Sequence, residues 1–336
     1  MNQIELTTST PAELPPVTRQ RLSQLFSREE IAQLTARSDW RGLWAIASTW
    51  AIIAGAFVML ALWPNVLTFV LALCIIAGRQ LALAILEHEG AHGTLFKTRW
   101  MNNVLADWLC ARPVWQNLMK YRAHHLVHHT KTGTELDPDI SLHAGYPATP
   151  RSMLRKSLRD LSGYTGLKLL FGLVLMDAGV IKWTVANDVT RLPQAGRRWR
   201  DYPLTFLRNA YGMLITNTAL FAIFAACGHA WFYGVWVLAY LTPFPFFLRI
   251  RSLAEHGMLE RVPDMFRNTR TTRAGIFARM WVAPVHVNYH LEHHAMASVP
   301  YYRLPRMHQL LRERKAIAEA PGYLDVMKMA ASSAAT

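Results

Sequence analysis

Residues 43–63 read LWAIASTWAIIAGAFVMLALW, a run of 21 positions without a charged side chain. A helix of that length rises about 30 Å, which matches the thickness of the hydrocarbon core of a bilayer. The chain as a whole has 336 residues, of which 52% are hydrophobic and only 17% are charged. This stretch therefore predicts a membrane-spanning helix.

Three further stretches have the same character. Residues 65–86 follow after a short turn and are interrupted only by Arg79 and Gln80. Residues 210–227 and 230–248 contain no charged side chain and are also separated by a short turn. The sequence thus predicts an all-α, polytopic membrane protein with four transmembrane helices in two hairpins.

Another apolar segment, residues 164–185, carries Lys168, Asp177 and Lys182. We interpret it as a helix that lies at the membrane interface, with a fifth span as the alternative.

The positive charge lies on one side of this arrangement. Of the 36 Lys and Arg residues, 35 fall in residues 1–42, 87–209 and 249–336, and the other, Arg79, lies within a span. The two hairpin turns carry none, which is the positive-inside pattern, so the three basic regions are expected in the cytoplasm. The net charge of +14 needs no nucleic-acid partner, because basic loops suit an anionic membrane surface.

Nine of the 14 histidines fall in three short motifs. The first is HEGAH at residues 88–92, the second is HHLVHH at 124–129, and the third is HLEHH at 290–294. Side chains three or four residues apart lie on one face of a helix, so the histidines of each motif converge. Imidazole binds iron, zinc and copper, and the motifs therefore predict a metal site in a cytoplasmic helical cap.

The ordinary interpretation of a histidine is a surface or hydrogen-bonded interior residue, and we apply it to the isolated His143, His229, His286 and His308. It does not suit the three motifs. Crowded imidazoles beside a bilayer would repel one another when protonated and would leave polar nitrogens unsatisfied when buried. Nine or ten imidazoles also exceed what one ion binds, whereas two ions with about four to six ligand positions each would use them.

Carboxylates near the motifs suit a supporting role, in which each accepts the second ring N–H of a metal-bound imidazole. The candidates are Glu87, Glu89, Asp137, Asp139, Glu255 and Glu292. For each of them, a solvated position on a loop or helix face is the alternative.

Two other functions fit parts of the pattern. HEGAH also matches the HExxH motif of zinc proteases, with Glu89 as the general base, but a single zinc site leaves most of the other histidines unexplained. A metal transporter would need polar ligands along its spans, which hold little beyond Arg79 and Asn217. A metal site beside apolar helices meets lipid chains instead, and removing hydrogen from such carbon requires redox metal chemistry. We therefore expect iron and dioxygen.

The order and spacing of HxxxH, RxxHxxHH and HxxHH, with helix hairpins between them, resemble the membrane fatty acid desaturase superfamily over residues 43–311. That superfamily includes acyl desaturases, lipid hydroxylases and carotenoid ketolases. The pattern beginning at Arg122 selects His125 over His124, and His256 resembles the isolated ligand found before the last motif. The resemblance implies the ligand set His88, His92, His125, His128, His129, His256, His290, His293 and His294.

The resemblance implies a di-iron, oxygen-dependent desaturase that introduces a double bond into a fatty acyl chain or acyl lipid. A hydroxylase or ketolase on the same scaffold is the alternative, because only the fate of the first carbon radical differs. The chain has no heme-binding His-Pro-Gly-Gly segment. Electrons are therefore expected from a separate ferredoxin, rubredoxin or cytochrome that docks on the basic cytoplasmic face.

We expect three regions along the chain. Residues 1–42 form a cytoplasmic tail with a short helix capped by Ser27 and Glu30, residues 43–311 form the membrane domain, and residues 312–336 form a C-terminal tail. The whole is expected to be a multi-pass integral membrane protein with its site on the cytoplasmic side.

Overall fold

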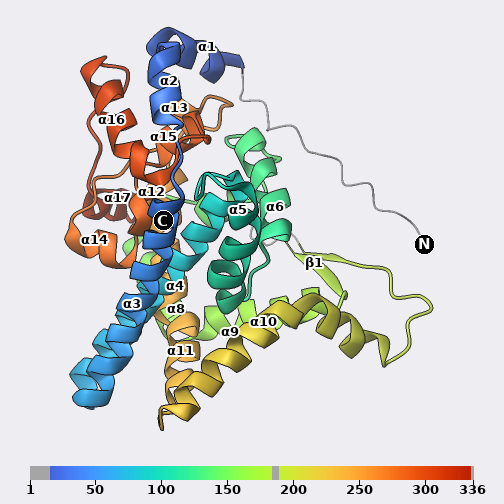
Figure 1. The fold of residues 1–336 in the computed structure, drawn as a ribbon. Coiled ribbons are helices and arrows are strands. Elements are labelled where there is room, and N and C mark those ends of the chain that lie inside the picture. Colours follow the sequence, from blue (N-terminus) through green and yellow to red (C-terminus); the bar gives the residue numbers. More distant parts are fainter. Residues whose placement is uncertain (1–15, 184–188, 334–336) are drawn as a thin grey trace.

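Two long helical hairpins form the membrane part of the protein in the computed structural model (Figure 1). The first joins α3 (Asp39–Leu62) to α4 (Val66–His92), and the second joins α10 (Asp201–Ala226) to α11 (Phe232–Leu241) and α12 (Pro243–His256). The structure describes residues 16–183 and 189–333. Within them, four helical stretches are long and apolar enough to cross a bilayer. The predicted all-α fold with two spanning hairpins is confirmed.

Local sequence signals set the ends of these helices. The side chain of Asn65 accepts a hydrogen bond from the backbone N–H of Thr68 and thereby caps the start of α4. Gly93, in the left-handed conformation at φ 68°, ends α4 directly after His92. Pro243 separates α11 from α12, because proline has no N–H to continue the helical ladder.

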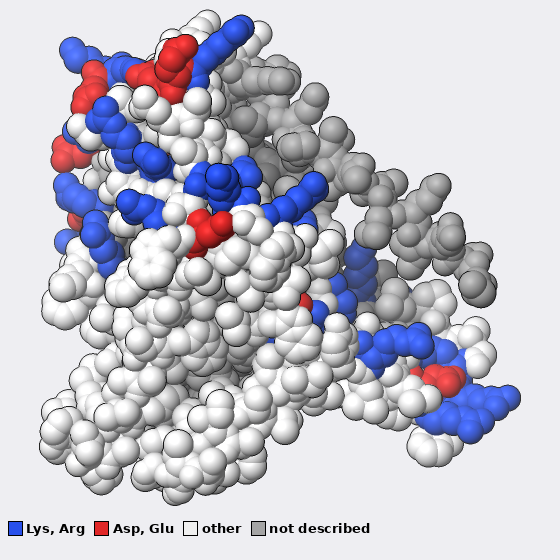
Figure 2. Space-filling view, in the orientation of Figure 1, with Lys and Arg blue, Asp and Glu red and all other residues white. Residues whose placement is uncertain are grey.

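Charged side chains avoid the turn ends of the hairpins. In Figure 2, Lys, Arg, Asp and Glu gather over the upper half of the molecule and at its lower right end, whereas the lower left part is free of them in this view. That part contains the α3–α4 turn and the α10–α11 turn (Figure 1). This distribution fits a bilayer around the lower part of the molecule.

Aromatic side chains join the two hairpins into one core. Trp50 of α3 stacks on Trp236 of α11 with ring centroids 5.9 Å apart, and its indole N–H donates to the carbonyl of Leu109 at 2.9 Å. The ring centroids of Phe57 and Phe224 of α10 lie 4.6 Å apart. Contacts between spanning helices stabilise the fold through van der Waals packing, because lipid tails are as apolar as these side chains.

Short helices form the cap above the hairpins. Its elements are α1 (Pro16–Leu25), α2 (Arg28–Leu34), α5 (Arg99–Ala106), η1 (Asp107–Ala111), η2 (Arg112–Val114), α6 (Leu118–Lys131), α7 (Ile140–His143), α8 (Pro150–Leu161), α13 (Met265–Asn268), α14 (Ile276–Trp281), η3 (Pro284–His286), α15 (His290–Ala295), η4 (Tyr301–Arg303), α16 (Leu304–Glu313) and α17 (Tyr323–Ala330).

The N-terminal helices cover the third histidine motif. Leu22 of α1 and Leu34 of α2 share a second apolar cluster with Leu291 of α15 and Leu311 of α16. The predicted cap of α2 is confirmed, since Ser27 and Glu30 form a reciprocal capping box.

The segment 164–185 contains both a helix and a strand. Helix α9 (Tyr164–Asp177) has 14 residues and rises about 21 Å, which is too short to cross a core of about 30 Å. The alternative of a fifth span is therefore wrong, and the interfacial position stays a prediction. Strand β1 (Ile181–Trp183) pairs antiparallel with β2 (Val189–Arg191), a hairpin that the apolar pattern did not predict. Residue 184 and the last predicted residue of the segment, 185, lie outside the described ranges.

Arg79, the cation within a span, docks a helix of the cap. Its guanidinium donates to the carbonyl of Arg279 at 3.0 Å and to that of Met280, at the end of α14. Gly78 permits this close approach, because a Cβ there would lie 2.5 Å from the Met280 carbonyl oxygen.

The region predicted as a C-terminal tail includes α17, whose Val326 is fully buried.

Candidate metal centre

The nine histidines of the expected ligand set lie in two adjacent clusters. One cluster holds His88, His92, His125, His129 and His293, and the other holds His128, His256, His290 and His294. Within each cluster, one ring nitrogen from every residue lies within 4.8 Å of the others. The sequence order of the motifs therefore folds into two compact nitrogen-lined positions. Their role as metal ligands stays a prediction.

The first motif lies on the last turn of α4. His88 and His92 are one turn apart there, with ring centroids 4.8 Å from each other. Gly90 lets α5 approach this turn, because a Cβ on it would lie 2.5 Å from the Cβ of Ala106. The glycine that weakens the helix is thus required for packing around the cluster.

The second and third motifs each contribute to both clusters. On α6, His125 and His129 belong to the first cluster and His128 to the second. On α15, His293 belongs to the first cluster and its neighbour His294 to the second. Adjacent residues on a helix point about 100° apart, so the two helices run between the clusters and serve both. The rings of His129 and His294 stack at 4.1 Å where the clusters meet.

The spacing of the nitrogens suits a shared cation. The Nε2 atoms of His125 and His129 are 3.0 Å apart, and those of His256 and His290 are 2.9 Å apart. Two imidazole nitrogens bound to one metal at about 2.1 Å, at right angles, would be separated by about 3.0 Å. Both ring nitrogens of His88 and of His294 are buried without a hydrogen-bond partner in the described part of the chain. A metal in each cluster would satisfy these orphaned nitrogens.

Burial favours the neutral imidazoles that metals bind. Burial first, and neighbouring imidazoles second, hold the pKa values of His125, His129, His290, His293 and His294 well below the usual value. A neutral ring offers a lone pair, whereas a protonated ring offers none. The site is therefore prepared for a cation.

One carboxylate orients a histidine of the second cluster directly. Oδ1 of Asp137 lies 2.7 Å from Nδ1 of His128, so Nε2 of that ring stays available to a metal ion. Burial alone would raise the pKa of Asp137, but the hydrogen bond with His128 lowers it below its usual value. Burial alone would lower the pKa of His128, and the same hydrogen bond raises it. The prediction that carboxylates support the ligands therefore fits Asp137 best.

The other candidate carboxylates have different partners. Glu255 pairs with Arg251 at 2.6 Å and lies 3.6 Å from Nδ1 of His290. Glu292 binds Nδ1 of His308 at 2.6 Å, and the Oε1 atom of Glu87 has no hydrogen-bond partner among the described residues.

Glu89, the general base required by a zinc-protease site, is already engaged. It accepts hydrogen bonds from the hydroxyl of Thr94 at 2.8 Å and from the backbone N–H of Tyr301 at 3.0 Å. Oε1 of Glu89 also lies 3.6 Å from Nδ1 of His88, a member of the first cluster. Through its hydrogen bond with Tyr301, Glu89 connects α4 to η4.

Arg122 connects the first two motifs. Its guanidinium donates to the carbonyls of Ala91 at 2.8 Å and Gly90 at 3.0 Å, and to Oδ1 of Asn103 at 2.7 Å. The arginine thereby satisfies carbonyls at the C-terminal end of α4 and fixes α6 against it. The RxxHxxHH pattern includes Arg122, but the sequence did not predict these hydrogen bonds.

The remaining histidines lie outside both clusters. His124 bonds to Asp139 at 2.7 Å, so the structure separates it from its neighbour His125. His229 stacks on Phe232 in the turn after α10. His143 lies closer than the sequence suggested, with its ring centroid 5.4 Å from that of His256. The sequence did not predict this proximity, because His143 is an isolated histidine on α7 and the loop before it has no periodic pattern.

Asn288 stands just before the third motif. Its Nδ2 donates to the carbonyl of Thr272 at 3.0 Å, and its Oδ1 is buried without a hydrogen-bond partner among the described residues.

Comparisons with known proteins show which family this sequence matches. A family model described as fatty acid desaturase matches residues 61–323, which is more than half of the chain. The chain is also 28% identical over 310 residues to the dihydrorhizobitoxine desaturase of Bradyrhizobium elkanii, with 90% of this chain and 82% of that protein covered. The matched region includes every histidine of the two clusters.

Proposed function

The chain belongs to the fatty acid desaturase family, and on that premise we propose that it is a di-iron, oxygen-dependent desaturase of fatty acyl chains or acyl lipids. Membership makes it an oxidoreductase of the membrane. The observation that carries the finer proposal is the pair of histidine clusters at the C-terminal ends of α4 and α12.

The two clusters would hold one iron ion each. His88, His92, His125, His129 and His293 would bind the first ion, and His128, His256, His290 and His294 the second. Iron accepts imidazole ligands and, unlike zinc, supplies the redox chemistry with dioxygen that cleavage of an unactivated C–H bond requires.

The overall reaction balances with an external donor. Two hydrogens leave adjacent carbons of the substrate and take two electrons with them. Two further electrons and two protons come from outside, and dioxygen is reduced to two waters. The chain's own contribution is to keep the ligands neutral by burial and to fix their rings, as Asp137 does for His128.

The apolar hairpins support an acyl substrate. Helices α4 and α12 carry the first motif and His256, respectively, at the ends of helical stretches that are long and apolar enough to cross a bilayer. The related protein from Bradyrhizobium elkanii has a name that gives dihydrorhizobitoxine as its substrate. That name supports desaturation over hydroxylation for this chain and leaves the choice of substrate to experiment.

A separate protein would deliver the electrons. Exposed basic residues lie on α2, on the first turn of α3 and on α16, and Figure 2 draws many of them over the upper half of the molecule. Such a surface attracts an acidic ferredoxin, rubredoxin or cytochrome. The positive-inside pattern favours a cytoplasmic position for this face.

The test is lipid profiling of cells that express the protein together with a reductase and an electron carrier. New double bonds are expected in the cells with the unaltered chain and are absent in cells with the His293→Ala variant. New hydroxyl groups in place of double bonds would assign the chain to the hydroxylases. A profile identical to that of the variant, with iron and donor both verified, would contradict lipid oxidation.

A further inference from the structure

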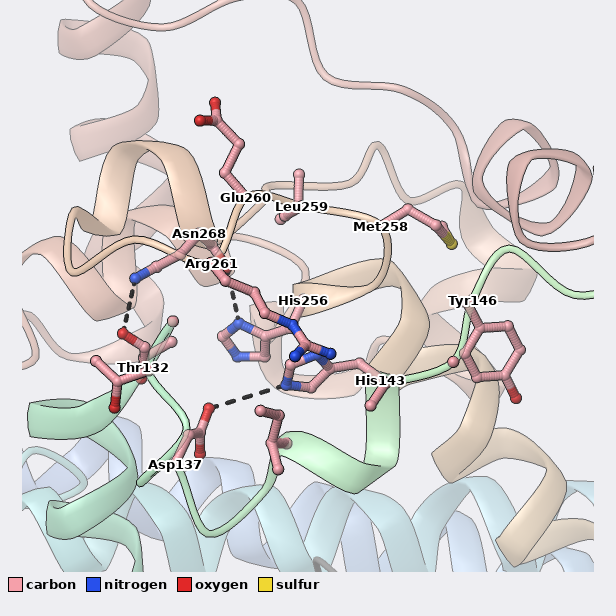
Figure 3. A pocket seen from close by; sticks show the side chains of 15 residues that line it. Thr132, Asp137, His143, Tyr146, His256, Met258, Leu259, Glu260, Arg261 and Asn268 are labelled. Carbon is pink, nitrogen blue, oxygen red and sulfur yellow. Dashed lines mark hydrogen bonds and ion pairs between the residues drawn. The ribbon is translucent and has the colours of Figure 1, made fainter.

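A small cavity lies beside the second histidine cluster, between α7 and the loop that follows α12 (Figure 3). Its volume is about 70 Å³, and His256 forms part of its wall. One water molecule needs roughly 10–15 Å³ of such cavity volume, so this cavity holds about five non-hydrogen atoms. It is therefore too small for an acyl chain and suits a compact polar group.

Two unsatisfied polar atoms face each other at the inner end of this cavity. Oδ2 of Asp137 and Nε2 of His143 are 3.8 Å apart, and Figure 3 shows the carboxylate and the imidazole directed at one another. Both atoms are buried without a hydrogen-bond partner in the described part of the chain. A separation of 3.8 Å is too long for a direct hydrogen bond. A donor atom at about 2.9 Å from each would satisfy both.

The charge changes sign between the inner end and the mouth. Asp137 is only 2% exposed, and its hydrogen bond with His128 keeps Oδ1 occupied and Oδ2 directed to the cavity. At the mouth, Arg261 is exposed, while Glu260 is already paired with Arg267. A buried carboxylate repels an anion and attracts a cation, and an exposed guanidinium does the reverse.

We propose that this cavity binds a primary ammonium group flanked by an oxyanion. The ammonium donates to Asp137 and His143, and the oxyanion lies at the mouth beside Arg261. Two sources carry this chemistry: a free α-amino acid and the head group of an aminophospholipid. Binding does not depend on the proposed reaction. It is nevertheless coupled to the second cluster, because the ligand contacts the wall at His256 and the carboxylate that holds His128.

The test measures binding of four small compounds to the purified, iron-loaded full chain by calorimetry and thermal unfolding. Glycine and O-phosphoethanolamine carry the ammonium and an oxyanion. Glycine betaine and phosphocholine carry the same charges, but their methylated nitrogens have no N–H to donate. We expect a saturable rise in Tm with one member of the first pair and none with either member of the second. Binding of glycine alone identifies a free amino acid as the source, and binding of O-phosphoethanolamine alone identifies the lipid head group.

Variants locate the binding. His143→Phe keeps a planar aromatic ring and removes the acceptor nitrogen, and Arg261→Glu reverses the charge at the mouth; each should abolish the response. Arg312→Glu makes the same charge change on the exposed face of α16, away from the cavity, and should leave the response unchanged. An equal response to the methylated compounds, no response to any compound, or a response that survives both cavity variants would overturn the proposal. Because turnover is not measured, failure of the desaturase proposal would be a separate result.

Discussion

His128 and His129 are consecutive on α6, yet their rings belong to different histidine clusters. The same division separates His293 from His294 on α15. Each of these helices therefore contributes rings to both histidine clusters and fixes their separation. The distance between the two clusters cannot change without moving a helix of the cap.

This division predicts the effect of single ligand losses. The variants His128→Ala and His129→Ala should each lower the metal content from about two ions per chain to about one, because each removes a ligand from only one cluster. Metal analysis of the purified variants measures this. His124→Ala is the matched control: His124 adjoins His125 but bonds to Asp139, so its loss should leave both ions in place. Equal loss in all three variants would contradict the assignment.

Asp137→Asn should weaken metal binding at the second cluster by about 10- to 100-fold, because the amide no longer provides the charged acceptor that orients His128. Competition with a chelator measures the affinity. Asp139→Asn removes a carboxylate of the same loop whose short contact is with His124, and the expected change is several-fold smaller. Similar losses in both variants would indicate that charge in the loop matters more than the individual hydrogen bond.

Gly90→Ala should destabilise the protein by about 1–3 kcal/mol, because its new methyl group would lie 2.5 Å from Cβ of Ala106 and 3.1 Å from the carbonyl oxygen of Asn102. The free energy of unfolding in detergent measures the effect. Gly55→Ala, in the same hairpin, meets no atom within 4 Å and should be neutral or stabilising. A neutral Gly90→Ala variant would show that α5 can move away from α4.

The metal-free protein should lose stability as the pH falls below about 6.5, the ordinary histidine pKa. Five cluster histidines outside the spans have pKa values lowered by burial and by neighbouring imidazoles. The unfolded chain therefore binds more protons than the folded chain in acid, so the free energy of unfolding decreases with falling pH. His128, whose pKa is raised, acts in the opposite direction but is a single group. Tm measured from pH 8 to pH 5.5 should fall; a constant Tm would contradict the buried neutral clusters.

Much of the fold was predictable because the membrane simplifies the sequence. Uncharged runs such as residues 43–63 leave few alternatives to a spanning helix. The β1–β2 hairpin was not predictable, since Ile181–Trp183 is three residues long and follows an apolar helix without a strand pattern. The end of α4 was not predicted either, although a glycine, Gly93, directly follows the first motif and ends the helix in the left-handed conformation.

The histidine set was predictable from motif spacing and family resemblance, but its division into two clusters was not. Spacing puts His290, His293 and His294 on one side of α15, and only the packing of α4, α6 and α12 around that helix decides which ring meets which cluster. His143 escaped prediction because its approach to Asp137 depends on the path of a loop.

The most direct test of a di-iron centre is metal analysis of the purified full-length protein after expression with added iron. We predict about two iron atoms per chain, one for each histidine cluster. One zinc atom per chain with no iron would contradict the account.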